Sequence, residues 1–489
     1  MVNSKGIGSP EQTENMFKTP IKWCSVSLSD VIFAGKRIDA TTFDIELIQA
    51  KESVQNSIYP TTTIIGKGGL CDAYRPGICK RIFVKPSASS IPMLIPSQVT
   101  DLYPKAEKHL SAKMEKEIKN WYVQSHEVLL TCSGTVGRLS FVSRTLDQKC
   151  VSQNLIRLVA KDENTAGYVY AYLNTKVGQI FLTRNNYGAV IQHIDPDHLL
   201  KVPVPDAPDV LKKRIHDLIV ASYELRDESN ELLDQAHTLL VEELQLPAIE
   251  DFDVKYFRRH APVDTYSVKL SDMAGRLDAS YHVPIVSAII KHLQEHAAEV
   301  TSIGDHRISS EVILPGRFKR VYVEEGFGRV FIGGKQLWEL DPSNKKYLSL
   351  IHHGDRITKQ LELHENMTLI TCSGTIGKVA LVGKHWENWA ANQHIIRVVP
   401  ANDEIAGYLN VFLSSEYGYQ LITHFTYGSV VDEIDDNHVR QIPFPLLKNK
   451  AVQDRINALA LEANKKRYEA YLLEQQAIEI MNNEVIFAK

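Results

Sequence analysis

The chain has 489 residues, of which 44% are hydrophobic and 23% charged, and its formal net charge is −4. This composition is typical of globular proteins and excludes disordered, collagen-like and mucin-like chains, and the length predicts two to four domains at roughly 100–200 residues each. No apolar run approaches the ~18 residues of a membrane span, and the six cysteines form no CxxC pair. We therefore expect a cytoplasmic protein with reduced thiols and no membrane association, in which basic faces are local.

After a polar stretch at residues 1–22, which lacks the apolar segment of a secretion signal and predicts a flexible tail, the chain is an internal duplication. TCSGTVGRLSFV at Thr131–Val142 returns as TCSGTIGKVALV at Thr371–Val382, an offset of 240 residues. Collinear matches at nearly the same offset pair Ser25–Asp30 with Ser267–Asp272, Arg37–Ala40 with Arg276–Ala279, Pro76–Val84 with Pro315–Val323, Gln153–Val159 with Gln393–Val399, and Tyr187–His198 with Tyr427–His438.

Each copy mixes strand and helix signals. In the first copy, EVLLTC (127–132) and RLSFV (138–142) predict short strands around a Ser-Gly-Thr-x-Gly turn. One helix is expected next, at about 166–182 in the first copy and 406–422 in the second. A Pro-x-Pro segment follows in each copy. Neither a helix nor a central strand accommodates two such prolines, so we place the end of each domain there. The pattern predicts two compact α+β domains, at residues 23–205 and 248–445.

A heptad pattern follows each domain, at residues 206–247 and 446–489. It predicts two long helices of about 35–38 residues, with small residues along one edge of the seam. We expect the two helices to pair with each other as an antiparallel coiled coil that spaces the domains. The alternative is that each packs on its own domain as an ordinary amphipathic helix. The predicted seam residues are Leu211, Leu218, Leu225, Leu232 and Leu239 in the first helix, and Leu459, Leu473 and Ile480 in the second.

Two globular domains, each followed by a long helix and each carrying an S-G-T-[IV]-G-[KR] turn, resemble the specificity (S) subunit of type I restriction-modification systems. The resemblance extends over nearly the whole chain from about Trp23. It implies two target recognition domains that each read one half of a split sequence in double-stranded DNA, and helices that act as spacer and as docking surface for methyltransferase subunits. It also implies a non-catalytic chain, joined by a restriction or translocase subunit, with S-adenosylmethionine, ATP and Mg held only by partner subunits.

The geometry agrees with this resemblance, because two related domains held apart by a rigid rod can read two half-sites on one face of a duplex. Since the domains differ in sequence, the target should be asymmetric, with a central gap whose length the helices set. Basic and acidic residues number 24 and 18 in residues 1–205, 4 and 10 in 206–247, 20 and 25 in 248–445, and 7 and 6 in 446–489. Much of the affinity for the DNA backbone should therefore come from partner subunits.

Two groups of side chains are candidates for DNA contact, and the alternative for every member is an ordinary solvated surface residue. Cations at equivalent positions of both copies suit phosphate contacts, whereas residues that differ in the variable stretches before the turn suit base reading. The first group is Lys80, Arg81, Arg138, Lys319, Arg320 and Lys378. The second group is Lys67, Arg75, Gln98, Arg317, Lys335 and Gln336.

Several catalytic motifs fail on inspection. SGTIGK is no phosphate-binding loop, because Cys372 stands where that loop needs glycine and Val379 where it needs Ser or Thr. The chain contains no Pro-Pro, so it lacks the loop of DNA amino-methyltransferases. We interpret EKEIK (115–119) as a solvated helical charge run, although Glu117 and Lys119 could mimic a nuclease motif.

The duplicated cysteines and D-x-x-H motifs also have structural explanations. Cys132 and Cys372 could be nucleophiles assisted by His198 or His438, but a small buried residue before a tight turn is the favoured interpretation. The D-x-x-H motif offers two potential metal ligands in each copy, which is too few, so we expect a turn and no metal. The functional alternatives left open are a recognition subunit of a type II-like restriction system, a scaffold that binds protein only, and, weakest, a self-contained nuclease.

Overall fold

The computed structural model describes residues 25–33, 44–184, 193–252, 254, 265–273, 275–342, 344–428 and 431–488. The expected flexible tail at 1–22, the repeated segment at 37–40 and residues 187–192 of another repeated segment lie outside the described residues. The chain forms two compact units: unit 1 comprises residues 1–100, 104–223 and 473–489, and unit 2 comprises residues 101–103 and 224–472. In the part of the chain that the structure describes, no helix is long and apolar enough to span a membrane.

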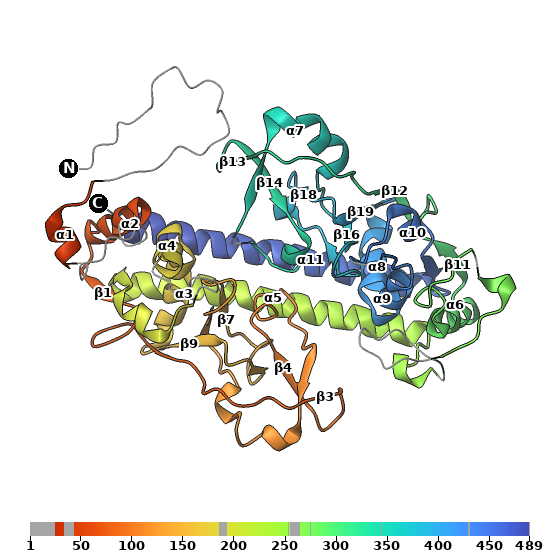
Figure 1. The fold of residues 1–489 in the computed structure, drawn as a ribbon, viewed down its shortest axis with the longest axis horizontal. Coiled ribbons are helices and arrows are strands. Elements are labelled where there is room, and N and C mark those ends of the chain that lie inside the picture. The colour runs from red at the N-terminus through yellow and green to blue at the C-terminus, as the bar shows by residue number, and fades with distance from the viewer. Residues whose placement is uncertain are drawn as a thin grey trace. The chain divides into compact units, whose positions relative to one another are not determined.

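Unit 1 is built on two four-stranded sheets and a two-stranded one (Figure 1). The main sheet has the antiparallel order β2 (Cys71–Tyr74), β9 (Leu155–Ala160), β6 (Val128–Thr131) and β7 (Leu139–Phe141). The small sheet has the order β3 (Phe83–Val84), β5 (Lys108–Leu110), β4 (Ile91–Leu94) and β8 (Cys150–Val151). β1 (Thr61–Thr63) pairs with β10 (Pro203–Pro205), and the helices are α1 (Leu28–Phe33), α2 (Ile45–Gln55), α3 (Ala166–Asn174) and α4 (Lys176–Arg184).

Unit 2 repeats this topology strand for strand, which confirms the duplication. Its main sheet has the order β12 (Ser309–Ile313), β19 (Ile395–Pro400), β16 (Thr368–Thr371) and β17 (Val379–Leu381). Its small sheet has the order β13 (Tyr322–Val323), β15 (Lys346–Ser349), β14 (Gly328–Ile332) and β18 (Ala390–Ala391). β11 (Glu299–Ser302) pairs with β20 (Pro443–Leu446), and the helices are α6 (Pro284–His296), α7 (Leu350–Arg356), α8 (Asp403–Ser414), α9 (Glu416–Thr423) and α10 (Asp436–Arg440).

The prediction of a single helix in this region is wrong in both copies, because the structure has two helices there, separated by one extended residue. Thr175 divides α3 from α4 with φ −66° and ψ 161°, and Ser415 divides α8 from α9 with φ −72° and ψ 163°. The hydroxyl of each accepts a hydrogen bond, at 3.1 Å, from the N–H of the glycine three residues later, Gly178 or Gly418. A Ser/Thr cap of this kind starts a new helix. The helical charge run expected at 115–119 is also not formed: residues 115–118 connect two short 3-10 turns, Ala112–Met114 and Lys119–Trp121.

Each main sheet buries an arginine at its centre. Arg157 and Arg397 occupy equivalent positions on β9 and β19, and both are 0% exposed. Arg157 donates to the backbone carbonyls of Trp121 at 2.7 Å and Tyr122 at 2.9 Å. Arg397 donates to the carbonyls of Leu361, Ile395 and Ala391, and burial lowers its pKa to about 9. The two guanidinium groups therefore tie the main sheet to the segments that lead into it.

The two predicted long helices are α5 (Asp209–Glu243) and α11 (Lys450–Ile480), the latter continued by a π-helical turn at Met481–Ile486. Within unit 1, Ile215, Ile219 and Tyr223 of α5 share one core with Ala477 and Ile480 of α11. Within unit 2, Ala236 and Leu240 share another core with Ile456 and Leu459.

The seam leucines are not the most buried line of these helices. Leu211, Leu218, Leu225, Leu232, Leu239 and Leu473 are half-buried, whereas Leu459 and Ile480 are buried. Small side chains beside the seam are 0% exposed, namely Ser222, Ser229, Ala236, Ala470 and Ala477, and so are the larger Ile215, Ile219, Leu240 and Ile456. Small residues at these positions leave room for another helix backbone to approach closely.

Candidate nucleic-acid interface

The duplicated Ser-Gly-Thr motif forms a tight turn between β6 and β7, and between β16 and β17. In unit 1, Thr131 Oγ1 donates to the carbonyl of Thr135 at 2.6 Å and accepts from the N–H of Arg138 at 3.0 Å. Thr371, Thr375 and Lys378 repeat this arrangement at 2.6 and 2.9 Å. The motif glycines have φ between 76° and 94°, in the left-handed region. The motif is therefore explained as a turn. The backbone N–H of Arg138 or Lys378 already donates a hydrogen bond within this turn.

The second duplicated motif, D-x-x-H, lies directly beside this turn. The N–H of Ile194 donates to the carbonyl of Cys132 at 3.1 Å, and that of Ile434 to Cys372 at 3.0 Å. His198 and His438 accept from the N–H groups of Asp195 and Asp435 at 2.9 and 3.2 Å, which closes a capping box at each following helical turn. The D-x-x-H motif is thus the turn that the sequence predicts. Among the described residues, no three His, Cys, Asp or Glu side chains are grouped to hold a metal ion.

The equivalent cysteines before the turn are buried, with 1% exposure for Cys132 and 3% for Cys372. Burial raises the pKa of both thiols, that of Cys372 to about 12. A thiol held protonated is a poor nucleophile, and the imidazole groups of His198 and His438 already cap a turn. The interpretation as small buried residues is confirmed.

Four of the predicted base-reading residues have partners close to the two motifs or in their own loops. Gln98 and Gln336 play the same role: their Oε1 atoms accept from the N–H groups of Ile95 and Gly333 at 3.1 and 2.9 Å. Arg75 pairs with Asp195 at 3.2 Å, and Arg317 pairs with Glu433 at 3.0 Å. Lys67 and Lys335 are exposed. The structure thus brings Arg75 and Arg317 close to the Ser-Gly-Thr turn and the D-x-x-H motif of their own units. The two glutamines stabilise their loops. Contact with bases stays a prediction for all six residues.

The predicted phosphate-contacting cations divide into exposed and stacked ones. Lys80 and Lys319 are exposed. Arg81 and Arg320 are half-buried, with each guanidinium 5.8 Å from the centre of a ring, Phe83 or Phe331. Lys378 Nζ lies 4.0 Å from the centre of Trp338, and Arg138 is half-buried. Lys80 and Lys319 are therefore the pair most available to a phosphate.

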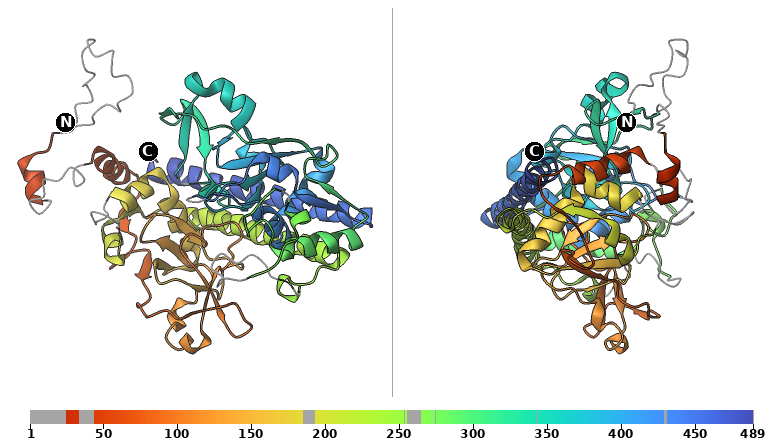
Figure 2. Two further views of the ribbon diagram at one scale, coloured as in Figure 1. Left: turned by 45° about the vertical axis from the view of Figure 1, so that its right-hand side comes forward. Right: turned by 90° about the vertical axis from the view of Figure 1, so that its left-hand side faces the viewer.

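Sequence reasoning missed an exposed aromatic side chain on the edge strand of each small sheet, Phe83 in unit 1 and Tyr322 in unit 2. Both lie inside repeated segments, PGICKRIFV and PGRFKRVYV. A hydrophobic residue in a strand is normally expected to be buried, so only the edge position shows that these rings reach solvent. Figures 1 and 2 show the orange segment with β3 at the periphery of unit 1.

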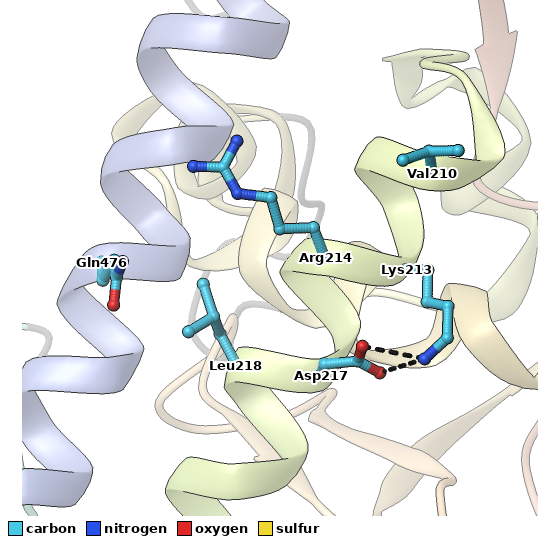
Figure 3. A pocket seen from close by; sticks show the side chains of 6 residues that line it. All are labelled: Val210, Lys213, Arg214, Asp217, Leu218 and Gln476. Carbon is cyan, nitrogen blue, oxygen red and sulfur yellow. Dashed lines mark hydrogen bonds and ion pairs between the residues drawn. The ribbon is translucent and has the colours of Figure 1, made fainter.

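A groove within unit 1 runs between α5 and the end of α11 (Figure 3). Its apolar lining includes Val210, which is 84% exposed, and the seam residue Leu218. Lys213 and Asp217 pair with each other along its side, at 2.7 Å. The groove thus places one exposed apolar side chain, that of Val210, beside charged side chains.

No family model and no curated protein matches this sequence. Solved structures do match. The S subunit of a type I restriction-modification system from M. genitalium is similar with a TM-score of 0.33 and 12% identity, over 87% of this chain and 95% of that one. The HsdS subunit from Thermoanaerobacter tengcongensis is similar with a TM-score of 0.27 and 13% identity, over 87% and 95%. A chain from a structure of the assembly and conformational transition of the type I R-M system has a TM-score of 0.25 and 12% identity, over 86% and 98%. The first two of these structures are S subunits, the family that the sequence resembles, and the third belongs to the same type of restriction-modification system.

Proposed function

We propose that this chain is the DNA sequence-recognition subunit of a type I restriction-modification complex. The observation that carries the proposal is the duplication: two units share one strand order, and each is linked to a long helix. A repeated scaffold whose surface residues differ suits two half-sites of different sequence. The target recognition domains are assigned to residues 23–205 and 248–445, and the target is an asymmetric sequence with a gap.

Residues common to both units are assigned to the DNA backbone and residues that differ to base choice. Lys80 and Lys319 are an exposed common pair. Beside the Ser-Gly-Thr turn, the equivalent residues differ in chemistry: His193 in unit 1 is replaced by Glu433 in unit 2, and each forms a β-bridge to the serine of its turn. An imidazole and a carboxylate suit different base edges, which supports an asymmetric target.

The long helices at 206–247 and 446–489 are proposed to pair as an antiparallel coiled coil that sets the gap. Contacts inside each unit support the pairing. In unit 2, Lys466 Nζ lies 2.6 Å from a carboxylate oxygen of Glu228, and the N–H of Asn449 donates to Glu243 at 3.2 Å, so the contacts run in opposite chain directions. In unit 1, Arg214 pairs with Glu484 at 2.8 Å.

We assign no reaction to this chain. Methyl transfer from S-adenosylmethionine and ATP- and Mg-dependent restriction are assigned to methyltransferase and restriction or translocase subunits. The acidic helix at 206–247, with 10 acidic and 4 basic side chains, supports a complex with partner subunits, because such a surface repels DNA and the affinity for the DNA backbone must come from elsewhere.

A genome-wide map of modified bases tests the proposal, made in source cells with this gene intact and deleted. Loss of one gapped, asymmetric methylated motif is the expected result. An unchanged map, together with no sequence-selective binding of duplex DNA by the chain and its methyltransferase partner, would contradict it.

Exchange of one recognition domain separates a DNA reader from a scaffold that binds protein only. Replacing residues 23–205 by the equivalent domain of another S subunit should change one half of the motif and leave the other half and the gap intact. A scaffold would leave the motif unaltered. Cleavage that needs no ATP would instead assign the chain to a type II-like system.

A further inference from the structure

An aromatic ring and a lysine ammonium group form the same exposed pair in both units. In unit 1, Phe83 is 49% exposed and Lys108 Nζ lies 5.5 Å from the centre of its ring. In unit 2, Tyr322 is 42% exposed and Lys346 Nζ lies 5.3 Å from its ring centre. We name these two pairs the ring–lysine pairs.

Strand register makes the two pairs equivalent. Phe83 is opposite Leu110 in the β3–β5 ladder, and Tyr322 is opposite Leu348 in the β13–β15 ladder. Each lysine precedes that leucine by two residues, so it lies on the same face of the sheet as the ring. Leu110 and Leu348 are both 0% exposed. The strand that carries each lysine is therefore anchored in the core by its buried leucine. Each exposed pair lies on a sheet and not in a loop.

An exposed ring on an edge strand is a liability, because an unpaired edge with apolar side chains promotes aggregation. Both units nevertheless carry one at the same register position. One exposed apolar side chain is ordinary on a protein surface, but its repetition at the same register position in two otherwise divergent units indicates that both units make the same contact with another molecule.

The charge around the ring–lysine pairs indicates an anionic partner. Residues 80–113 carry six Lys and Arg against the carboxylates of Asp101 and Glu107. Residues 317–346 carry seven Lys and Arg against four carboxylates, although residues 248–445 as a whole carry 20 basic and 25 acidic side chains. Basic character in unit 2 is thus concentrated on the segment that forms the small sheet. Cations around an apolar ring match duplex DNA, which offers phosphates beside the apolar surface of sugars and thymine methyl groups.

We propose that the ring–lysine pairs are DNA-contacting elements of the two half-sites, Phe83 and Lys108 in the first and Tyr322 and Lys346 in the second. The ring packs on sugar or base-edge surface in a groove, and the ammonium group contacts the adjacent phosphate. This inference rests on the proposed function, because it names the surface through which each recognition domain meets its half-site.

The test uses the full chain assembled with its methyltransferase subunits and a labelled duplex that carries the motif lost from the deletion strain. Affinity is measured at several salt concentrations for Phe83→Ala, Tyr322→Ala, Lys108→Gln and Lys346→Gln. Each alanine variant should bind about tenfold more weakly, the range of one lost base contact, and each glutamine variant should lower the salt dependence by about one phosphate contact. Tyr322→Phe should bind like the wild type.

Two controls remove an exposed apolar side chain elsewhere in the same units: Ile58→Ala, where 59% of the residue is exposed, and Leu277→Ala, where 85% is exposed. Both should bind like the wild type. Unchanged affinity and salt dependence in the four test variants, with selective binding by the wild type, would overturn the inference and leave the proposed function standing. Weaker assembly with the methyltransferase subunits but unchanged DNA affinity of the assembled complex would also overturn it, in favour of a protein-docking surface. A wild-type complex that binds no duplex selectively would overturn both proposals.

Discussion

The Nδ1 atom of His216 accepts a hydrogen bond from the backbone N–H of Gly167 at 3.1 Å. The equivalent pair in unit 2 is Asn457 and Gly407, in which Asn457 Oδ1 accepts a hydrogen bond from the backbone N–H of Gly407 at 2.8 Å. Each glycine lies where a short helix of its unit packs closely against a long helix: α3 against α5 in unit 1, and α8 against α11 in unit 2. A Cβ atom at Gly407 would lie 2.4 Å from the carbonyl oxygen of Asn457, and one at Gly167 would lie 2.7 Å from Cα of His216.

Gly407→Ala should lower the free energy of unfolding by about 1–3 kcal/mol, because backbone atoms cannot move aside and the helices must separate. Urea unfolding of the full chain measures the effect. Gly354→Ala is the matched control, since Gly354 lies in α7 with nothing within 4 Å of its Cβ position. The control should be neutral or more stable by up to about 1 kcal/mol, as alanine is the better helix former. Equal midpoints for wild type and Gly407→Ala would contradict the close contact.

His216 should make unit 1 sensitive to acid. Burial, and next the neighbouring His126, lower the pKa of His216 below that of an exposed histidine, about 6.5. A lowered pKa in the folded state means that the stabilising form is neutral. Its contribution is therefore complete above about pH 6.5 and is lost as the pH falls from there through the lower pKa of the folded state. Protonation of Nδ1 would also remove the acceptor for Gly167.

His216→Asn gives the measurement, because asparagine occupies the equivalent position of unit 2 and keeps an acceptor that does not titrate in this range. The urea midpoints of wild type and variant are compared between about pH 8 and about pH 5. The wild type should lose stability relative to the variant as the pH falls. Two parallel curves would show that His216 does not contribute to the pH dependence.

Arg157→Met should destabilise unit 1 by about 2–5 kcal/mol. The variant keeps an apolar stem but leaves the buried carbonyls of Trp121 and Tyr122 without their donors, and each buried unpaired polar group costs about 1–3 kcal/mol. Lys116→Met at an exposed position is the control and should change stability by less than about 0.5 kcal/mol. A stable Arg157→Met protein would mean that the carbonyls find other partners.

The local elements were predictable where a short motif determines its own geometry. The strands around the Ser-Gly-Thr turn follow from alternation and two glycines, and β6 (Val128–Thr131) and β7 (Leu139–Phe141) form as expected. The break at Thr175 was not predicted, because hydrophobic periodicity continues across it and only the hydroxyl cap on Gly178 reveals it. In such a place a local side-chain hydrogen bond overrides the pattern.

The candidate interface was less predictable, because its members meet only through strand pairing. Nothing in the sequence near Phe83 indicates that Lys108 will lie over its ring, since β3 and β5 are separated by about 25 residues of chain. The loop contacts of Gln98 and Gln336 are equally hidden, because a glutamine that caps a loop and one that reads a base have the same sequence signature. The assignment of residues 473–489 to unit 1 depends on packing of Ala477 and Ile480 against that core, and a heptad pattern does not identify its partner.

Lys80→Gln and Lys319→Gln test the phosphate contacts. Both lysines are exposed and equivalent, so each variant should lower the slope of log affinity against log salt by about 1, and the double variant by about 2, without changing the motif. Binding of the assembled complex to the cognate duplex provides the slopes. Lys465→Gln on α11, an exposed lysine near Glu462 and Glu469, is the control and should leave the slope unchanged. A changed recognition sequence would instead assign Lys80 or Lys319 to base reading.

Val210→Asp should weaken docking of the methyltransferase subunit. Val210 is 84% exposed at the start of α5 and lines the groove of Figure 3. An acidic residue in the first turn of a helix interacts favourably with the helix dipole, so this substitution should not destabilise the helix. If the groove is covered by a partner, the new carboxylate is desolvated there, and affinity between subunits should fall by about tenfold or more.

The matched control is Val210→Thr, which has nearly the same shape and no charge. Affinity of the purified chain for the methyltransferase subunit is measured for both variants, with urea unfolding as the check on folding. Weakened association in Val210→Asp alone, at unchanged stability, assigns the groove to the partner interface. Equal association in both variants would place the docking surface elsewhere on the long helices, because a charge cannot be buried in an apolar contact without a cost of several kcal/mol.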